Sequence, residues 1–202
     1  MTYDLLTALL AFAFVTSITP GPNNLMLMAS GANFGWQRTL PHMLGIGAGF
    51  VLLVFLVGAG LVQIFDAYPV TYTVLKIVSV GFLLYLAYKI AISAPPKNAT
   101  VIVAGAPMTF LQAAAFQWVN PKAWAMALSA ISAYTPAGSG LWGVAVVALI
   151  FGSVNFPSIN CWVFLGTQLR RVLNVPWKLR AFNFSAALLL IGSLYPIVFG
   201  QS

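Results

Sequence analysis

Two short polar clusters interrupt the apolar stretches of this sequence, and both contain residue types that could bind a charged small molecule. The first runs from Thr19 to Asn24 and reads TPGPNN, and the second is Asn120, Pro121 and Lys122. Each proline in the first cluster removes a backbone donor and clashes with the carbonyl four residues before it, so a continuous helix cannot pass. In an apolar surrounding, unwound backbone is tolerated only where protein or a water-filled cavity satisfies its polar groups. The first cluster therefore predicts a binding site or a path for a polar solute.

The two helix ends created by this break suit opposite charges. After the prolines the helix resumes, and we expect the free amides of Asn23, Asn24 and Leu25 to present partial positive charge to a carboxylate. The preceding half-helix ends near Ile18 and Thr19, whose unpaired carbonyls could receive an ammonium group. A molecule that carries both groups on one carbon fits this pair of ends. The break thus favours an amino acid over a sugar or a metal ion.

Lys122 and Lys76 are the two basic residues that lie away from the cytoplasmic connections within long apolar stretches, where a charge is expensive enough to suggest a function. Lys122 follows Pro121 near the middle of its stretch. It could be the countercharge for a carboxylate, a group that gains and loses a proton, or a donor to the carbonyls freed by the first break. Lys76 lies nearer the outer interface, where either snorkelling to water or a functional role would explain it.

Acidic residues are almost absent, because only Asp4 and Asp66 occur and both lie at the ends of apolar stretches. A carrier of divalent cations would need carboxylate or similar oxygen ligands, so we predict no metal site. A strong site for a cationic amino acid would also need a countercharge for its side chain. The sequence therefore favours a small neutral substrate.

The elements that must position these residues are membrane-spanning helices. Of the 202 residues, 61% are hydrophobic and 5% are charged, against roughly 25% charged in a soluble domain. We predict an all-α membrane protein in which nearly every surface faces the lipid bilayer or another helix. Six apolar segments are long enough to span: 5–32, 43–65, 70–93, 108–133, 141–167 and 181–200.

The placement of the two breaks predicts an inverted repeat within a single transporter domain, 1–202. Repeat one covers about 1–93, a cytoplasmic linker 94–106, and repeat two about 107–202. The breaks then fall in helices one and four at comparable depth. Because three spans precede the second repeat, its first helix enters the membrane from the opposite side, and the two broken helices can meet near the midplane.

Basic residues in the connections predict the orientation. Connections one, three and five, together with the span end at Lys89, carry seven basic residues and no acidic one, so they are expected to be cytoplasmic and both termini to lie on the outer, periplasmic side. The net charge of +7 follows from this topology, and its division among short loops argues against binding of nucleic acid. The seven residues are Arg38, Lys89, Lys97, Arg170, Arg171, Lys178 and Arg180.

Polar residues at the depth of the breaks complete the expected site. Gln117 precedes Asn120 by one turn on the same helix face, and Asn155 lies in the fifth segment at a similar depth. We expect these three side chains to line a cavity. The predicted substrate-binding residues are Ile18, Thr19, Pro20, Gly21, Pro22, Asn23, Asn24, Gln117, Asn120, Pro121, Lys122 and Asn155.

The sequence resembles the lysine exporter family, in its homoserine/threonine resistance branch, over essentially its whole length. This resemblance implies a bacterial inner-membrane exporter of amino acids that is driven by proton exchange, and the asparagine pair is most similar to the branch that exports cysteine and O-acetylserine. The motifs that carry it are TPGPNN, the GxxxG of Gly45 and Gly49, Lys76 and Gly81 ahead of Tyr85, and NPK at 120–122.

Proton exchange would require a titrating group, for which Lys122, Lys76, His42 and Asp4 are the candidates. A solvated histidine beside a helix end is the alternative for His42. We therefore predict a secondary active exporter of small neutral amino acids that works by alternating access and needs no cofactor.

Three alternatives stay open at this point. The chain could export another small polar metabolite or an ion. It could also be a membrane enzyme or a non-transporting scaffold, although one histidine, one cysteine and no core carboxylate leave few groups from which an enzyme could build an active site.

The GxxxG pattern could pack within one chain or across a homodimer.

Overall fold

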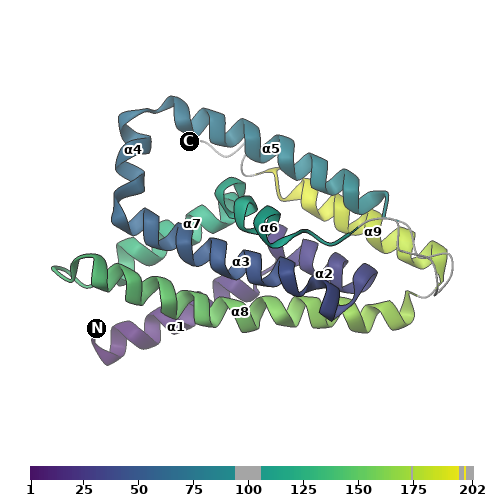
Figure 1. The fold of residues 1–202 in the computed structure, drawn as a ribbon, viewed down its shortest axis with the longest axis horizontal. Coiled ribbons are helices and arrows are strands. Elements are labelled where there is room, and N and C mark those ends of the chain that lie inside the picture. The colour runs from purple at the N-terminus through teal and green to yellow at the C-terminus, as the bar shows by residue number, and fades with distance from the viewer. Residues whose placement is uncertain (94–105, 174, 196–197, 199–202) are drawn as a thin grey trace.

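The computed structural model describes residues 1–93, 106–173, 175–195 and 198, and within them the regular structure is entirely helical. The predicted linker, 94–106, lies outside the described residues except for Ala106. Figure 1 labels the α-helices. They are α1 Tyr3–Ile18, α2 Pro22–Phe34, α3 Trp36–Leu56, α4 Val62–Ala67, α5 Val70–Ala91, α6 Phe110–Phe116, α7 Pro121–Tyr134, α8 Gly140–Val172 and α9 Pro176–Gly192.

The predicted breaks in the first and fourth segments are present. The first segment is divided into α1 and α2, which are bent by 56° at their junction. The fourth is divided into α6 and α7, with a short 3-10 turn, Gln117–Val119, ahead of Asn120. Local chemistry explains both positions, since each new helix begins with a proline in its first turn, where the missing N–H has no partner to lose.

The all-helical class is confirmed for the described residues, whereas six spans stay a prediction. Three stretches are long and apolar enough to cross a membrane, namely Trp36–Ala67, Val70–Ala91 and Gly140–Leu169, and α1 with α2 would make a fourth. Exposed apolar side chains suit contact with lipid, as at Ile77 on α5 (66% exposed) and Leu149 on α8 (63% exposed).

One predicted connection is wrong. Between the predicted segments 5–32 and 43–65 we expected a turn over 33–41, but the connection is a single residue, Gly35, between the end of α2 and the start of α3. Gly35 has φ of 83°, a left-handed conformation that glycine adopts without steric penalty and that turns the chain within one residue. The Thr39 hydroxyl donates to the Gly35 carbonyl at 2.8 Å and so helps to satisfy the junction.

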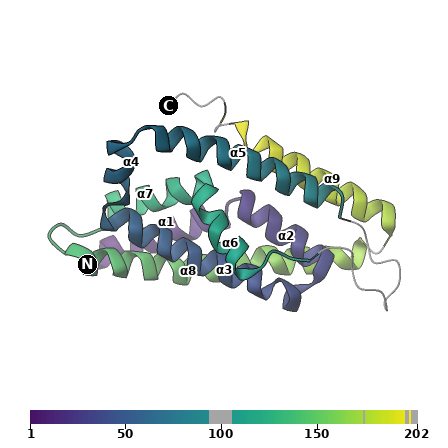
Figure 2. The same ribbon diagram turned by 45° about the horizontal axis from the view of Figure 1, so that its top comes forward.

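The helices form layers, and α2, α6 and α7 of the two broken helices are central. In Figures 1 and 2, α5 and α9 lie side by side along one face, and α1, α3 and α8 lie toward the opposite face. Between them are α2, α6 and α7. The broken helices each pack on one long helix of the opposite half, α1 and α2 against α8, and α6 against α3. Gly21 and Pro22 of the first break and Gln117 and Asn120 of the second are buried, whereas Thr19 and Pro20 are exposed.

Small residues allow this close packing. A Cβ added at Gly49 on α3 would lie 2.7 Å from the Cα of Ala114 on α6, and one at Gly45 would overlap the carbonyl of Phe110. The GxxxG pattern thus packs within the chain, against α6. On the other side, a Cβ at Gly31 or Gly166 would overlap the backbone of the facing helix in the α2–α8 pair.

Replacing Gly166 by alanine should destabilise the protein. The new Cβ would overlap the Met28 carbonyl on α2, and backbone atoms cannot rotate away, so we expect a loss of about 1–3 kcal/mol in unfolding free energy. Thermal unfolding in detergent would measure it. Gly81→Ala on α5 is the control, because nothing lies within 4 Å of its added Cβ. Equal melting temperatures for the two variants would contradict the packing of α2 on α8.

Candidate functional site

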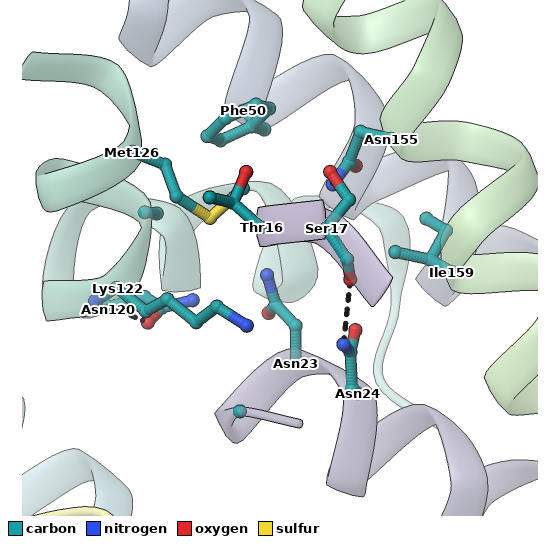
Figure 3. A pocket seen from close by; sticks show the side chains of 12 residues that line it. Thr16, Ser17, Asn23, Asn24, Phe50, Asn120, Lys122, Met126, Asn155 and Ile159 are labelled. Atoms are coloured by element: carbon teal, nitrogen blue, oxygen red, sulfur yellow. Dashed lines mark hydrogen bonds between the residues drawn. The ribbon is translucent and has the colours of Figure 1, made fainter. Parts of the chain in front are cut away.

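A small pocket lies where the two helix breaks meet (Figure 3). Its cavity volume is about 20 Å³, and the value of about 310 Å³ for all of its empty space includes space open to solvent. Side chains reach it from the end of α1, the start of α2, the start of α7, and the middle of α3 and α8. The lining residues are Thr16, Ser17, Gly21, Asn23, Asn24, Phe50, Asn120, Lys122, Ala123, Met126, Asn155 and Ile159.

The start of α2 forms one side of the pocket. Gly21 is its N-cap, Pro22 is its first residue, and no side chain caps its first turn. The Leu25 amide donates to the Gly21 carbonyl at 3.0 Å. The expectation that Leu25 has a free amide is therefore wrong, because the first hydrogen bond of the helix already uses it. The positive end of the α2 dipole still points to the break.

The carbonyls at the end of α1 have protein partners, contrary to expectation. The Asn24 amide group donates to the carbonyls of Ser17 at 2.9 Å and Thr19 at 2.8 Å. The indole N–H of Trp162 on α8 donates to the Ile18 carbonyl at 3.1 Å. The break thus releases backbone acceptors that side chains from α2 and α8 satisfy.

Lys122 also contributes to these carbonyls. Its Nζ donates to the carbonyl of Thr19, and to that of Pro20 at 3.4 Å. A Cβ on Gly21 would lie 2.6 Å from Lys122 Cδ, so the lysine reaches the break by crossing a residue that has no side chain. Of the three roles considered for Lys122, donation to the freed carbonyls is the one the geometry displays.

At the second break, the residue that precedes α7 caps this helix. The Asn120 side chain accepts a hydrogen bond from the Lys122 amide at 3.2 Å, which caps the start of α7. Pro121 occupies the first position of that helix. Unlike α2, α7 therefore begins with a side-chain cap.

A reciprocal amide pair joins the two breaks. Asn23 Nδ2 donates to Gln117 Oε1 at 2.8 Å, and Gln117 Nε2 donates back to Asn23 Oδ1 at 3.2 Å. Gln117 is fully buried and also donates to the Ala113 carbonyl at 2.9 Å. This pair holds the start of α2 against the end of α6, so the two halves of the chain share one polar centre.

Half of the residues that were predicted to bind the substrate line the pocket. Gly21, Asn23, Asn24, Asn120, Lys122 and Asn155 line it. The others, Ile18, Thr19, Pro20, Pro22, Gln117 and Pro121, lie in the same breaks but outside the lining.

Six lining residues were missed by the sequence reasoning. Helical spacing from the breaks could have indicated Thr16, Ser17, Ala123 and Met126. Phe50 and Ile159 come from α3 and α8, and only the tertiary packing brings them to the pocket.

Among the candidates for proton coupling, only Lys122 lines the pocket. Asp4 is exposed in the first turn of α1, and Lys76 is exposed on α5. His42 is 2% exposed and neither of its ring nitrogens has a hydrogen-bond partner. A solvated His42 is therefore wrong: α3 begins earlier than predicted, which places this side chain inside the packed part of the helix.

Comparisons with known proteins match nearly the whole chain. The family model for LysE type translocators matches residues 14–193. A cysteine/O-acetylserine efflux protein of Escherichia coli O139:H28 is 30% identical over 198 residues, which cover 95% of this chain and 96% of that protein. Proteins of the same description from Escherichia coli K12 and Shigella sonnei are 29% identical over the same shares. No solved structure matches this chain.

Replacing Gln117 by leucine should show that the amide pair stabilises the meeting point of the breaks. The change leaves the half-buried Asn23 without its partner, and an unpaired polar group costs about 1–3 kcal/mol when it is fully buried. The two single variants and Asn23→Leu/Gln117→Leu form a double-mutant cycle, whose coupling in thermal or denaturant unfolding should exceed about 0.5 kcal/mol. Gln63→Leu, at an exposed position of α4, is the control. Additive effects in the cycle would argue against the pair.

Proposed function

This chain belongs to the family of LysE type translocators, and we propose that it exports small neutral amino acids of the cysteine or O-acetylserine kind from the bacterial cytoplasm. The relatives are named for efflux of these two compounds. The observation that carries the proposal within this chain is the pocket between the two breaks. It is small, it contains one cation, Lys122, and no carboxylate is among its lining residues.

The charges of the pocket suit an α-carboxylate. Lys122 and the uncapped start of α2 both contribute positive potential on the same side, where Asn23 and Asn24 also lie. The Lys122 ammonium is held by carbonyls of the first break and not by a carboxylate. Its charge therefore remains available to a bound anion.

The side chain of the substrate would face apolar groups. Phe50, Met126 and Ile159 line the pocket and are 2%, 8% and 1% exposed. A thiol or an acetyl ester is compatible with such a wall, whereas a second ammonium or guanidinium group would find no anionic partner there. This favours neutral over basic amino acids.

The packing supports two inverted repeats of three helices. In that arrangement α1 and α2 correspond to α6 and α7, α3 to α8, and α5 to α9. The packing partners obey this correspondence. In the first repeat α1 and α2 pack on α8, and in the second α6 and α7 pack on α3. The equivalent helices α3 and α8 pack on each other, as do α5 and α9. We propose that rocking of the halves around the shared pocket gives alternating access.

The distribution of basic residues supports an orientation with the N-terminus outside the inner membrane. The start of α3, the end of α5 and the start of α9 lie at one end of the molecule, and the N-terminus lies at the other (Figure 1). Arg38, Lys89 and Lys178 belong to the first group of helix ends. We assign that end to the cytoplasm by the positive-inside rule. Lys122 is the proposed proton carrier, since it alone of the candidates reaches the pocket.

Substitution of Lys122 by methionine should reduce export at least about tenfold, because the carboxylate loses its countercharge and one desolvated charged contact is worth that much. Asn24→Ala should act similarly, because the Ser17 carbonyl loses its side-chain donor and the Thr19 carbonyl loses one of its two donors. The measurement is cysteine or O-acetylserine counterflow in proteoliposomes under an imposed pH gradient.

Lys89→Met, at an exposed position in the last turn of α5, is the matched control and should transport normally. Insertion of each variant would be checked by its yield in the membrane. Normal counterflow by both Lys122→Met and Asn24→Ala would refute the site assignment.

A panel of amino acids should separate substrates by side-chain charge. We expect cysteine, O-acetylserine and serine to exchange at least about tenfold faster than lysine and arginine, since a buried unpaired cation is strongly disfavoured. Protein-free liposomes correct for passive leak. Equal rates for lysine and cysteine would contradict selection by the neutral pocket.

A further inference from the structure

One lining residue has a buried acceptor that the protein leaves without a partner. Asn155 on α8 is 5% exposed, and its Nδ2 donates to the Ser17 hydroxyl at 3.1 Å. Its Oδ1 is buried and accepts no hydrogen bond. Buried polar atoms are nearly always paired, because leaving one unpaired is destabilising. Among the described residues, His42 and Thr135 also hold unpaired buried atoms, but neither lines the pocket.

The carbonyls first expected to bind the substrate ammonium already accept hydrogen bonds from side chains of the protein. The Thr19 carbonyl accepts from both Asn24 and Lys122, which uses its two lone pairs. The Ile18 carbonyl accepts from Trp162. A substrate ammonium at this helix end would have to displace donors that satisfy the break, whereas Asn155 Oδ1 has no donor to displace.

The positions of the side chains suit a zwitterion. In Figure 3, Asn155 and Lys122 lie on opposite sides of the pocket, with Asn23 and Ser17 between them. Phe50 lies above this line, near Met126. If the carboxylate of a substrate lies beside Lys122, its ammonium group would lie on the opposite side, where Asn155 Oδ1 has no donor. The substrate side chain would then contact the apolar residues Phe50 and Met126.

We infer that Asn155 Oδ1 binds the ammonium group of the amino-acid substrate and so selects primary α-amino acids over carboxylates that lack an amine. The inference rests on the proposed function, and assigns one role within that site. Asn155→Leu should remove the preference for the amine, whereas Asn155→Asp, which keeps an acceptor at the same place, should retain it.

The test measures binding of two probes to the purified protein by calorimetry. Cysteine carries the ammonium, and 3-mercaptopropionate is its analogue without one. Wild-type protein should bind cysteine at least about tenfold more tightly, the advantage of one charge-assisted hydrogen bond. In Asn155→Leu the affinity for cysteine should fall to that for 3-mercaptopropionate. The affinity for 3-mercaptopropionate should stay within about twofold of its wild-type value.

Asn155→Asp should keep the affinity for cysteine and weaken that for 3-mercaptopropionate, since its carboxylate attracts the ammonium and repels an anion. Asn160→Leu is the control on the same helix. Asn160 bonds to Trp36 and to the Phe156 carbonyl, outside the pocket, and its loss should leave the ratio of affinities unchanged.

The outcomes separate the inference from the proposed function. If wild-type protein binds cysteine and Asn155→Leu weakens both probes equally, Asn155 has only a structural role and the inference is overturned. If Asn155→Leu does not fold, Asn155→Asp decides, and equal loss of both probes overturns the inference. If wild-type protein binds neither cysteine nor O-acetylserine, the proposed function fails and the inference fails with it.

Discussion

The structure depends on one constraint, which is that backbone groups freed inside a membrane protein must find partners within the protein. The residues from Thr19 to Gly21 break the first helix and release the carbonyls at the end of α1. Asn24, Trp162 and Lys122 satisfy those carbonyls, and they come from α2, α8 and α7. The break is therefore also the point that fixes the relative positions of three helices.

Small residues and amide pairs make this arrangement possible. Glycines let α2 approach α8 and α3 approach α6 to backbone contact, so the long helices can support the broken ones. One reciprocal amide pair, Asn23 with Gln117, joins the breaks, and a second, Asn33 with Asn183, joins α2 to α9 at 3.0 and 3.3 Å. Both pairs have one member in each half of the chain. An amide can donate and accept at once, which lets two side chains inside the protein satisfy each other without net charge.

The sequence predicted what local chemistry determines. Proline and glycine placed the breaks, the apolar segments gave the helices, and the motifs gave the family that the comparisons confirm. What it could not give were partners distant along the chain. Trp162 lies 144 residues from Ile18, and no spacing rule connects them. For the same reason the sequence did not indicate that Phe50 and Ile159 line the pocket. It also predicted a solvated His42, which is buried in the structure. The turn at Gly35 was missed for another reason: a left-handed glycine replaces a loop by one residue.

The scarcity of acidic residues has a consequence for how Lys122 works. A lysine buried beside an aspartate or glutamate would be neutralised as a pair and would offer little to a bound anion. Here the ammonium contacts the carbonyls of Thr19 and Pro20, whose dipoles stabilise its charge without cancelling it. The two acidic residues of the chain, Asp4 and Asp66, lie at helix ends outside the pocket. A pocket built in this way keeps net positive potential in a low-dielectric surrounding, where a carboxylate is attracted strongly and a second cation is repelled. In the proposed function the broken helix and the missing carboxylates thus act together, since the first supplies the dipoles that hold the lysine and the second would leave its charge for the substrate.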